Sequence, residues 1–83
     1  MNRREWGLEV AGKATFETFT LPPYTVVVAT YQWHRACGVA KCRHDDEWKD
    51  SEGFSRAKGR ALKALADELF LADALGAVCK QAA

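Results

Sequence analysis

A long stretch without proline fills the second half of this 83-residue chain and constrains its fold more than any other feature. From Gly53 to Val78 the sequence reads GFSRAKGRALKALADELFLADALGAV, and the strong helix formers Ala and Leu dominate it. Asp50 or Ser51 stands where the N-cap of a helix is expected. We therefore expect one helix over about residues 51–76. Because a helix must bury its apolar side, the first half of the chain has to supply the surface beneath it.

The first half has the pattern of β-strands. The segment KATFETFTL alternates between its two faces with a period of two, and Pro22-Pro23 then marks a turn. The next segment, YTVVVATYQW, is rich in β-branched and aromatic residues and is the clearest strand of the chain. In CGVAKCR, small residues alternate with longer ones. We expect the hairpin loop before this third strand at His34-Arg35-Ala36.

These patterns predict an α+β fold of the order β-β-β-α. Three antiparallel strands over about residues 13–43 form a sheet, and the C-terminal helix packs on one face of it. A chain of this length buries only a little over ~60 % of its unfolded surface, so we expect a single domain, residues 1–83, with one core. Gly38 and Ala40 have almost no side chain, which allows Ala57 and Ala61 of the helix to approach the third strand closely.

The predicted helix has two distinct faces. At 100° per residue its broad apolar face holds Phe54, Ala57, Ala61, Leu62, Leu65, Leu69 and Ala72. Phe70 points away from that face if the helix is straight. Either the helix ends near residues 70–76, or Phe70 and the C-terminal segment meet a partner, such as a second copy in a homodimer.

Two histidines and two cysteines lie within eleven positions, at His34, Cys37, Cys42 and His44. Structural zinc sites need four ligands that converge on one point, with each pair two to four residues apart around a turn. On a strand, Cys37 and Cys42 are an odd number of residues apart and face opposite sides. Fully extended they are about 16 Å apart, beyond the reach of a shared ligand or a disulfide. The spacing therefore favours a structural role over a metal site.

Catalytic patterns are equally weak. Cys42 with His44 has the residue types of a thiol–imidazole pair, but no Gly-rich or oxyanion-forming loop accompanies them. The acidic run Asp45-Asp46-Glu47 has ligands suited to a divalent ion, but such runs also favour the positive end of a following helix. We expect neither an enzyme nor a cofactor.

A basic row on the helix is the strongest candidate for a binding site. Residues 56–66 hold four basic groups and no acid, whereas residues 45–55 hold five acids and one Lys. Arg56, Arg60 and Lys63 share the side opposite the apolar face. Glu52 can pair with Arg56, and Asp67 with Lys63. The row is either a solvated surface or the contact for an anionic partner.

Three further residues extend this candidate surface. Lys41 and Arg43, at the end of the third strand, add positive charge, and Trp48 places an aromatic ring in the acidic loop DDEWKDSE. Trp is enriched in the energetic centres of protein interfaces. Trp48 can equally pack beneath the start of the helix.

Overall charge and hydropathy narrow the class of protein. The net charge is +1 and the pI is about 7.7, whereas dedicated nucleic-acid binders usually exceed a pI of about 9. The apolar runs are too short for a membrane span, and basic residues at the N-terminus are not followed by the apolar run of a signal peptide. Three cysteines do not suggest a disulfide framework, so we expect a cytoplasmic protein.

The segment GVAKCRHDDEWKDSEGFSRAKGRAL resembles a pattern of small proteins from tailed phages and prophages. Its elements are G-x-A-x-C, a spaced Asp and aromatic, and a Gly followed by a helix with A-x-x-R-A-L. The matching residues are Gly38, Ala40, Cys42, Asp46, Trp48, Gly53, Ala57, Arg60, Ala61 and Leu62. The resemblance covers about a third of the chain and implies a small β-β-β-α protein of mobile-element origin.

The predicted order of three strands and a helix is also similar to the double-stranded-RNA-binding domain, which ends in three antiparallel strands and a helix. SRAKGRALKALA resembles the Lys/Ala pattern of that helix at Ala57, Lys58 and Ala61. The family's first helix has no expected counterpart ahead of residue 13, and its Gly-Pro-x-His loop is missing. The resemblance implies the topology, with phosphate contacts from the helix start as its functional consequence.

Two functions follow from these observations. The first is a phage-type protein-binding module that modulates host nucleic-acid or defence machinery, as anti-CRISPR inhibitors do, with a host protein or nucleoprotein complex as its partner. The second is a protein that binds double-stranded nucleic acid through Arg56, Arg60 and Lys63, with Lys41 and Arg43 beside them.

Overall fold

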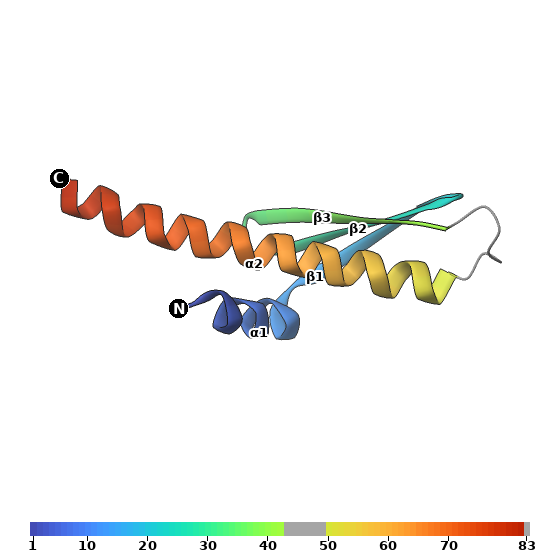
Figure 1. Ribbon diagram of the computed structural model, residues 1–83, viewed down its shortest axis with the longest axis horizontal. Coiled ribbons are helices and arrows are strands. Elements are labelled where there is room, and N and C mark those ends of the chain that lie inside the picture. Colours follow the sequence, from blue (N-terminus) through green and yellow to red (C-terminus); the bar gives the residue numbers. More distant parts are fainter. Residues whose placement is uncertain (43–49, 83) are drawn as a thin grey trace.

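The computed structural model describes residues 1–42 and 50–82. Its elements are α1 (Arg3–Lys13), β1 (Thr15–Leu21), β2 (Tyr24–Tyr31), β3 (His34–Lys41) and α2 (Asp50–Ala82). The strands form one antiparallel sheet in the order β1-β2-β3, and α2 runs along one face of it with α1 beside it (Figure 1). The expected α+β fold, with three antiparallel strands followed by a long helix, is confirmed.

Helix α1 corrects the expectation that no helix precedes residue 13. It begins with a capping box, in which the Asn2 side chain accepts a hydrogen bond from the Glu5 backbone N–H at 2.8 Å and the Glu5 carboxylate accepts one from Asn2 N–H at 3.5 Å. Val10 is fully buried in the core, which fixes the helix in place. This helix has two glycines and few apolar residues, so its helical periodicity is weak. Its N-x-x-E capping signature is nevertheless present in the sequence.

The first hairpin turns at Pro22-Pro23, as the sequence predicts, whereas the second turns earlier than expected. Leu21 pairs with Tyr24, and Tyr31 pairs with His34, so each turn has only two residues. The second turn is Gln32-Trp33, with Gln32 at φ 55°, in the left-handed region that two-residue hairpins favour. The expected loop at residues 34–36 is therefore wrong, because those residues already belong to β3. The sequence has no Asn or Gly at the true turn to mark it.

Strand register divides the sheet into an inner face beneath the helices and an outer face. On the inner face, Val27 pairs with Gly38 and Thr25 pairs with Ala40. Thr25, Val27 and Ala29 of the central strand are buried, and so is Ala40 of β3. The alternation expected for the third strand is confirmed by these pairs, since side chains on neighbouring positions face opposite sides.

A close contact joins β3 to α2 at Gly38. A Cβ atom built on Gly38 would lie 2.1 Å from the Ala57 carbonyl oxygen and 2.5 Å from the Ala61 nitrogen. Ala57 and Ala61 are themselves fully buried. The small-residue contact that the sequence predicts is thus present, and it is a contact between two backbones.

Helix α1 adds a second layer of packing to α2 that the sequence does not reveal. Ala66 lies outside the predicted apolar face and is nevertheless buried, whereas Ala72, predicted to be apolar-facing, is exposed. The Arg3 guanidinium lies 5.0 Å from the centre of the half-buried Phe70 ring. Phe70 is therefore covered within the chain, and α2 continues to Ala82 instead of ending near residue 76.

A polar contact joins α1 to the central strand. The Glu9 carboxylate lies 2.6 Å from Lys13 Nζ and accepts a hydrogen bond from the Tyr31 hydroxyl at 3.3 Å. The hydrogen bond from Lys13 lowers the pKa of the Glu9 carboxyl, and the same bond raises the pKa of Lys13. The Trp6 and Tyr31 rings form a T-shaped pair with a centroid distance of 6.2 Å, which packs α1 against the end of β2.

The contact at Gly38 predicts opposite effects for one chemical change at two glycines. Gly38→Ala should lower the free energy of unfolding by about 1–3 kcal/mol, because backbone atoms of α2 occupy the space of the new methyl group. Gly59→Ala should raise it by up to about 1 kcal/mol, because Gly59 is exposed within α2 and has nothing near its Cβ position. Urea unfolding of both variants measures these two changes in the free energy of unfolding. Equal effects would show that the helix does not rest on Gly38.

Candidate partner-binding face of helix α2

The residues of the possible zinc site do not converge in the described part of the chain. His34 lies on the inner side of the sheet, with Nδ1 3.8 Å from Glu68 Oε1 of α2. Cys37 pairs with Val28 on the outer face and is exposed. Cys42 follows the end of β3, and its N–H donates to the Pro23 carbonyl at 2.8 Å. Among the side chains that the structure describes, those of residues 1–42 and 51–76, no three or more metal-ligating groups come together, and His44 lies outside these ranges.

Because His34 and Cys37 face opposite sides of the sheet, we predict that folding does not depend on zinc. Elemental analysis of chelator-treated protein should find far less than stoichiometric metal, with an unchanged circular dichroism spectrum. Stoichiometric zinc, with unfolding on its removal, would contradict this.

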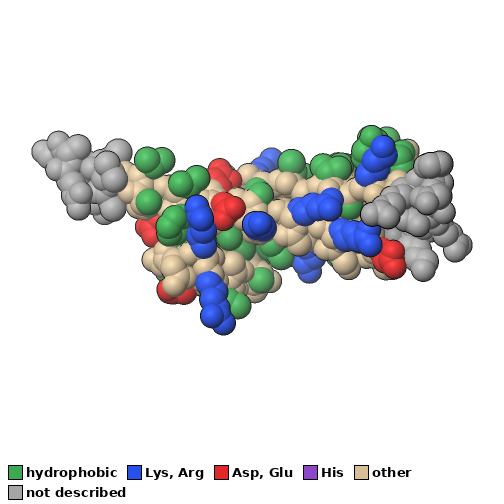
Figure 2. Space-filling model, in the orientation of Figure 1, with side chains coloured by type: hydrophobic (Ala, Val, Ile, Leu, Met, Phe, Trp, Pro, Cys, Tyr) green, Lys and Arg blue, Asp and Glu red, His purple; other side chains and the backbone are tan. Residues whose placement is uncertain are grey.

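The predicted basic row lies on the exposed side of α2, but its three residues are not equivalent. Figure 2 shows Lys and Arg side chains following this helix along one face of the molecule. Arg56, Arg60 and Lys63 are all exposed. The Arg60 guanidinium, however, donates a hydrogen bond to the Val39 carbonyl of β3. Since β3 is an edge strand, this bond satisfies a backbone group that has no neighbouring strand in the three-stranded sheet.

In the described part of the chain, the ion pairs expected along this row are not formed. Asp67 Oδ1 lies 3.6 Å from Arg3 Nε of α1, and among the described side chains, those of residues 1–42 and 51–76, no ion pair links it to Lys63. Among the same residues, Glu52 does not pair with Arg56 either. The local helix spacing therefore gives the wrong partner for Asp67, because α1 brings a competing guanidinium. Arg56 and Lys63 are left as cations without an ion pair to any described residue.

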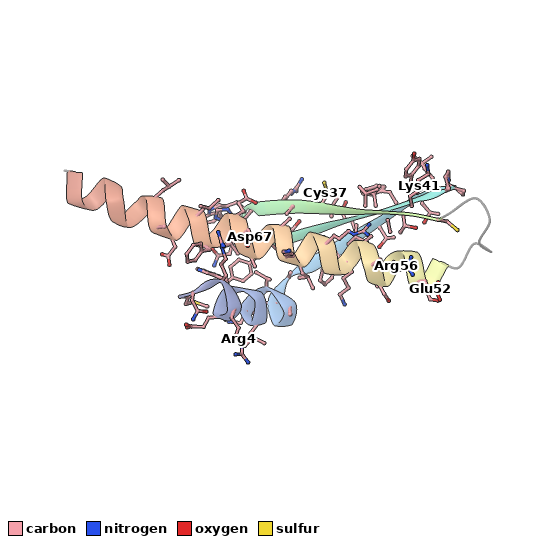
Figure 3. The ribbon with its side chains drawn as sticks, in the orientation of Figure 1. Arg4, Cys37, Lys41, Glu52, Arg56 and Asp67 are labelled. Carbon is pink, nitrogen blue, oxygen red and sulfur yellow. The ribbon has the colours of Figure 1, made fainter. Side chains whose placement is uncertain are left out.

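The other candidate residues do not join the row. Lys41 pairs with Tyr24 on the outer face of the sheet, and its Nζ lies 5.7 Å from the centre of that ring. Figure 3 shows Lys41 and Arg56 on different sides of the sheet. Lys58, also on α2, lies 4.7 Å from the centre of the Phe16 ring and so belongs to the packing at β1. Arg43 and Trp48 lie outside the described residues, as does the acidic run 45–47.

An exposed aromatic that sequence reasoning misses lies at the tip of the second hairpin. Trp33 is 86 % exposed. The strand pattern of YTVVVATYQW makes it the last residue of a strand, where a neighbouring strand would cover part of it. Trp33 is exposed because it lies in the two-residue turn Gln32-Trp33, beyond the paired residues of β2 and β3. Because Trp is enriched at the centres of interfaces, Trp33 is an aromatic available for contact.

Comparison with protein-family models, with curated proteins and with solved structures found no match for this chain. Within the described residues, no helix is both long and apolar enough to cross a membrane.

The bond from Arg60 to β3 predicts a difference in stability among the three cations of the row. Arg60→Ala should lower the free energy of unfolding by about 1 kcal/mol, since it removes a hydrogen bond to an edge carbonyl. Arg56→Ala and Lys63→Ala should change it by less than about 0.5 kcal/mol. Urea unfolding of the three single variants measures the difference. If all three variants unfold alike, the bond to Val39 contributes nothing to stability.

Proposed function

We propose that this chain is a small, non-enzymatic binding module of phage or mobile-element origin. It acts by protein–protein contact on host nucleic-acid or defence machinery, in the manner of anti-CRISPR inhibitors. The supporting features are the resemblance of residues 38–62 to small phage proteins and a basic row on an otherwise nearly neutral chain. The partner carries an acidic patch that meets this row.

The length of the basic row is the observation that carries this proposal. From Arg56 to Lys63 the row extends about 10 Å along the helix, at 1.5 Å per residue. Glu52 precedes it and Asp67 follows it on the same side of α2. A short positive patch with acids at both ends suits an acidic protein surface of limited size. Such charges accelerate encounter with the right partner and exclude surfaces of like charge.

Binding of double-stranded nucleic acid is the second candidate, and α1 favours it. The resemblance to the double-stranded-RNA-binding domain implies a helix ahead of three strands and a second helix, and α1 supplies an element in that position. Such domains span about 16 base pairs of duplex, far more than one short row of cations covers. Arg4, exposed on α1, would have to contribute to a contact of that size.

One pair of substitutions separates the two candidates. Arg56→Ala and Lys63→Ala together remove two cations that form no ion pair with the described residues, so the fold should be retained. In a pull-down from host lysate, treated with nuclease, the double variant should fail to capture the protein that the wild type retains. Arg4→Ala is the matched control, because it removes an exposed cation from α1 and should leave the pull-down unchanged.

Duplex binding across a range of salt concentrations tests the alternative. For the proposed protein contact, the wild type should bind duplex RNA and DNA weakly. For a nucleic-acid function, its affinity should be submicromolar at low salt and fall steeply between about 50 and 200 mM salt. The double variant should then flatten the salt slope by up to about two units, one for each phosphate that is no longer neutralised. That second result would replace our proposal with the alternative.

A further inference from the structure

The outer face of the sheet is apolar and is not covered by any described element. Both helices pack on the inner face, so the outer side chains of all three strands face solvent within the described structure. Leu21 is 71 % exposed, Phe19 51 %, Tyr24 43 % and Val39 42 %. The half-buried Val26 and Val28 lie between them on the central strand. A bare sheet face with this many large apolar side chains marks an interaction surface.

Register arranges this outer face in four rows across the strands. The two central rows are Phe19-Val26-Val39 and Glu17-Val28-Cys37. The two outer rows are Leu21-Tyr24-Lys41 and Thr15-Thr30-Arg35. Within these rows, charged residues occur only on the edge strands, and their signs are separated. The acid is on β1, whereas both cations are on β3.

This separation of charge makes the face complementary to itself. A two-fold axis that runs along β2, in the plane between two facing sheets, places β1 of one copy over β3 of the other. Phe19 then lies over Val39, and Val26 over its own equivalent. Glu17 lies over Cys37, with Arg35 the next outer residue along that strand. Two such contacts form, one on each side of the axis, because a two-fold interface repeats every contact.

The other two-fold arrangement is electrostatically unfavourable. With the axis across the strands, β3 of one copy runs antiparallel over β3 of the other, so Lys41 meets Arg35. Glu17 then lies over the apolar ring of Phe19. Like charges placed opposite one another, and a carboxylate buried against a ring, both oppose association. Charge therefore selects the arrangement with the axis along β2.

We propose that the outer face of the sheet binds the outer face of a second copy, with the two-fold axis along β2. The result is a four-layer dimer with helices outside and two sheets packed about 10 Å apart in the middle. Three strands with four rows make a contact on the order of 1,000 Å² in total, at the low end of specific interfaces. The dimer is accordingly weak and reversible. The basic rows of both α2 helices stay accessible on its two outer surfaces.

Sedimentation velocity of the wild type tests the dimer directly. Between about 5 and 300 µM, a range that includes micromolar dissociation constants, the weight-average mass should rise from monomer toward dimer. Val26→Lys places a charge on the axis and should keep the protein monomeric throughout. Leu75→Lys is the matched control, since Leu75 is 62 % exposed but lies on α2, away from the sheet. A monomeric wild type at the highest concentration, or loss of the dimer only in Leu75→Lys, would overturn the proposal.

A charge-exchange cycle tests the arrangement. Glu17→Arg and Arg35→Glu should each weaken the dimer about tenfold, because each places like charges together on both sides of the axis. The double variant should recover wild-type affinity to within about threefold, since it restores opposite charges. Recovery of affinity is specific to a second copy, because only a second copy carries the same two exchanged charges. Any other partner would have its original charges opposite both altered residues. Failure to recover would exclude this arrangement.

Alkylation of Cys37 gives a measurement that needs no variant. Cys37 lies in a central row of the outer face and is exposed in the single chain (Figure 3). Its rate of reaction with iodoacetamide, followed by peptide mass spectrometry, should fall severalfold as protein concentration rises through the dimer range. Cys42, beyond the end of β3, is the internal reference and should react at a constant rate. A Cys37 rate that is independent of protein concentration would contradict the proposal.

Discussion

The backbone contact between β3 and α2 at Gly38 sets the geometry of the whole molecule. Because the Ala57 carbonyl and the Ala61 nitrogen occupy the space where a Cβ would lie, the helix rests directly on the strand. Small residues on both sides permit this approach, and the larger core residues Val27 and Leu65 are fully buried beside it. At about 1.5–3 kcal/mol for a typical fully buried aliphatic side chain, a few such residues account for much of the stability of a small domain.

This close packing also determines which surfaces remain available. With α2 over the inner face of β2 and β3, and α1 beside it, both helices are used on one side of the sheet. Among the described residues, no further helix or strand covers the other side. The exposed row of α2 and the outer face of the sheet therefore point in opposite directions. A charged contact and an apolar contact can form at the same time without competing.

Arg60 shows that cations in one row of a helix can have different roles. It has the same spacing and charge as Arg56 and Lys63, yet its guanidinium reaches the edge of β3 and binds the Val39 carbonyl. Asp67 likewise bonds to another element, because it forms an ion pair with Arg3 of α1 instead of Lys63. Local spacing predicts which charges share a helix side. It does not predict which of them a neighbouring element takes into its own bonds.

Periodicity alone determined the three strands, the long C-terminal helix and the small-residue contact, because side-chain alternation and helical spacing are properties of the local sequence. It did not reveal that Gln32-Trp33 forms the turn, that Ala66 is buried in the core, or that Phe70 lies beneath Arg3. Each of these depends on an element distant in sequence, or on a turn without its usual residues. Tertiary structure also decided that Asp67 pairs with Arg3 and not with Lys63, because α1 brings the Arg3 guanidinium to that side of α2.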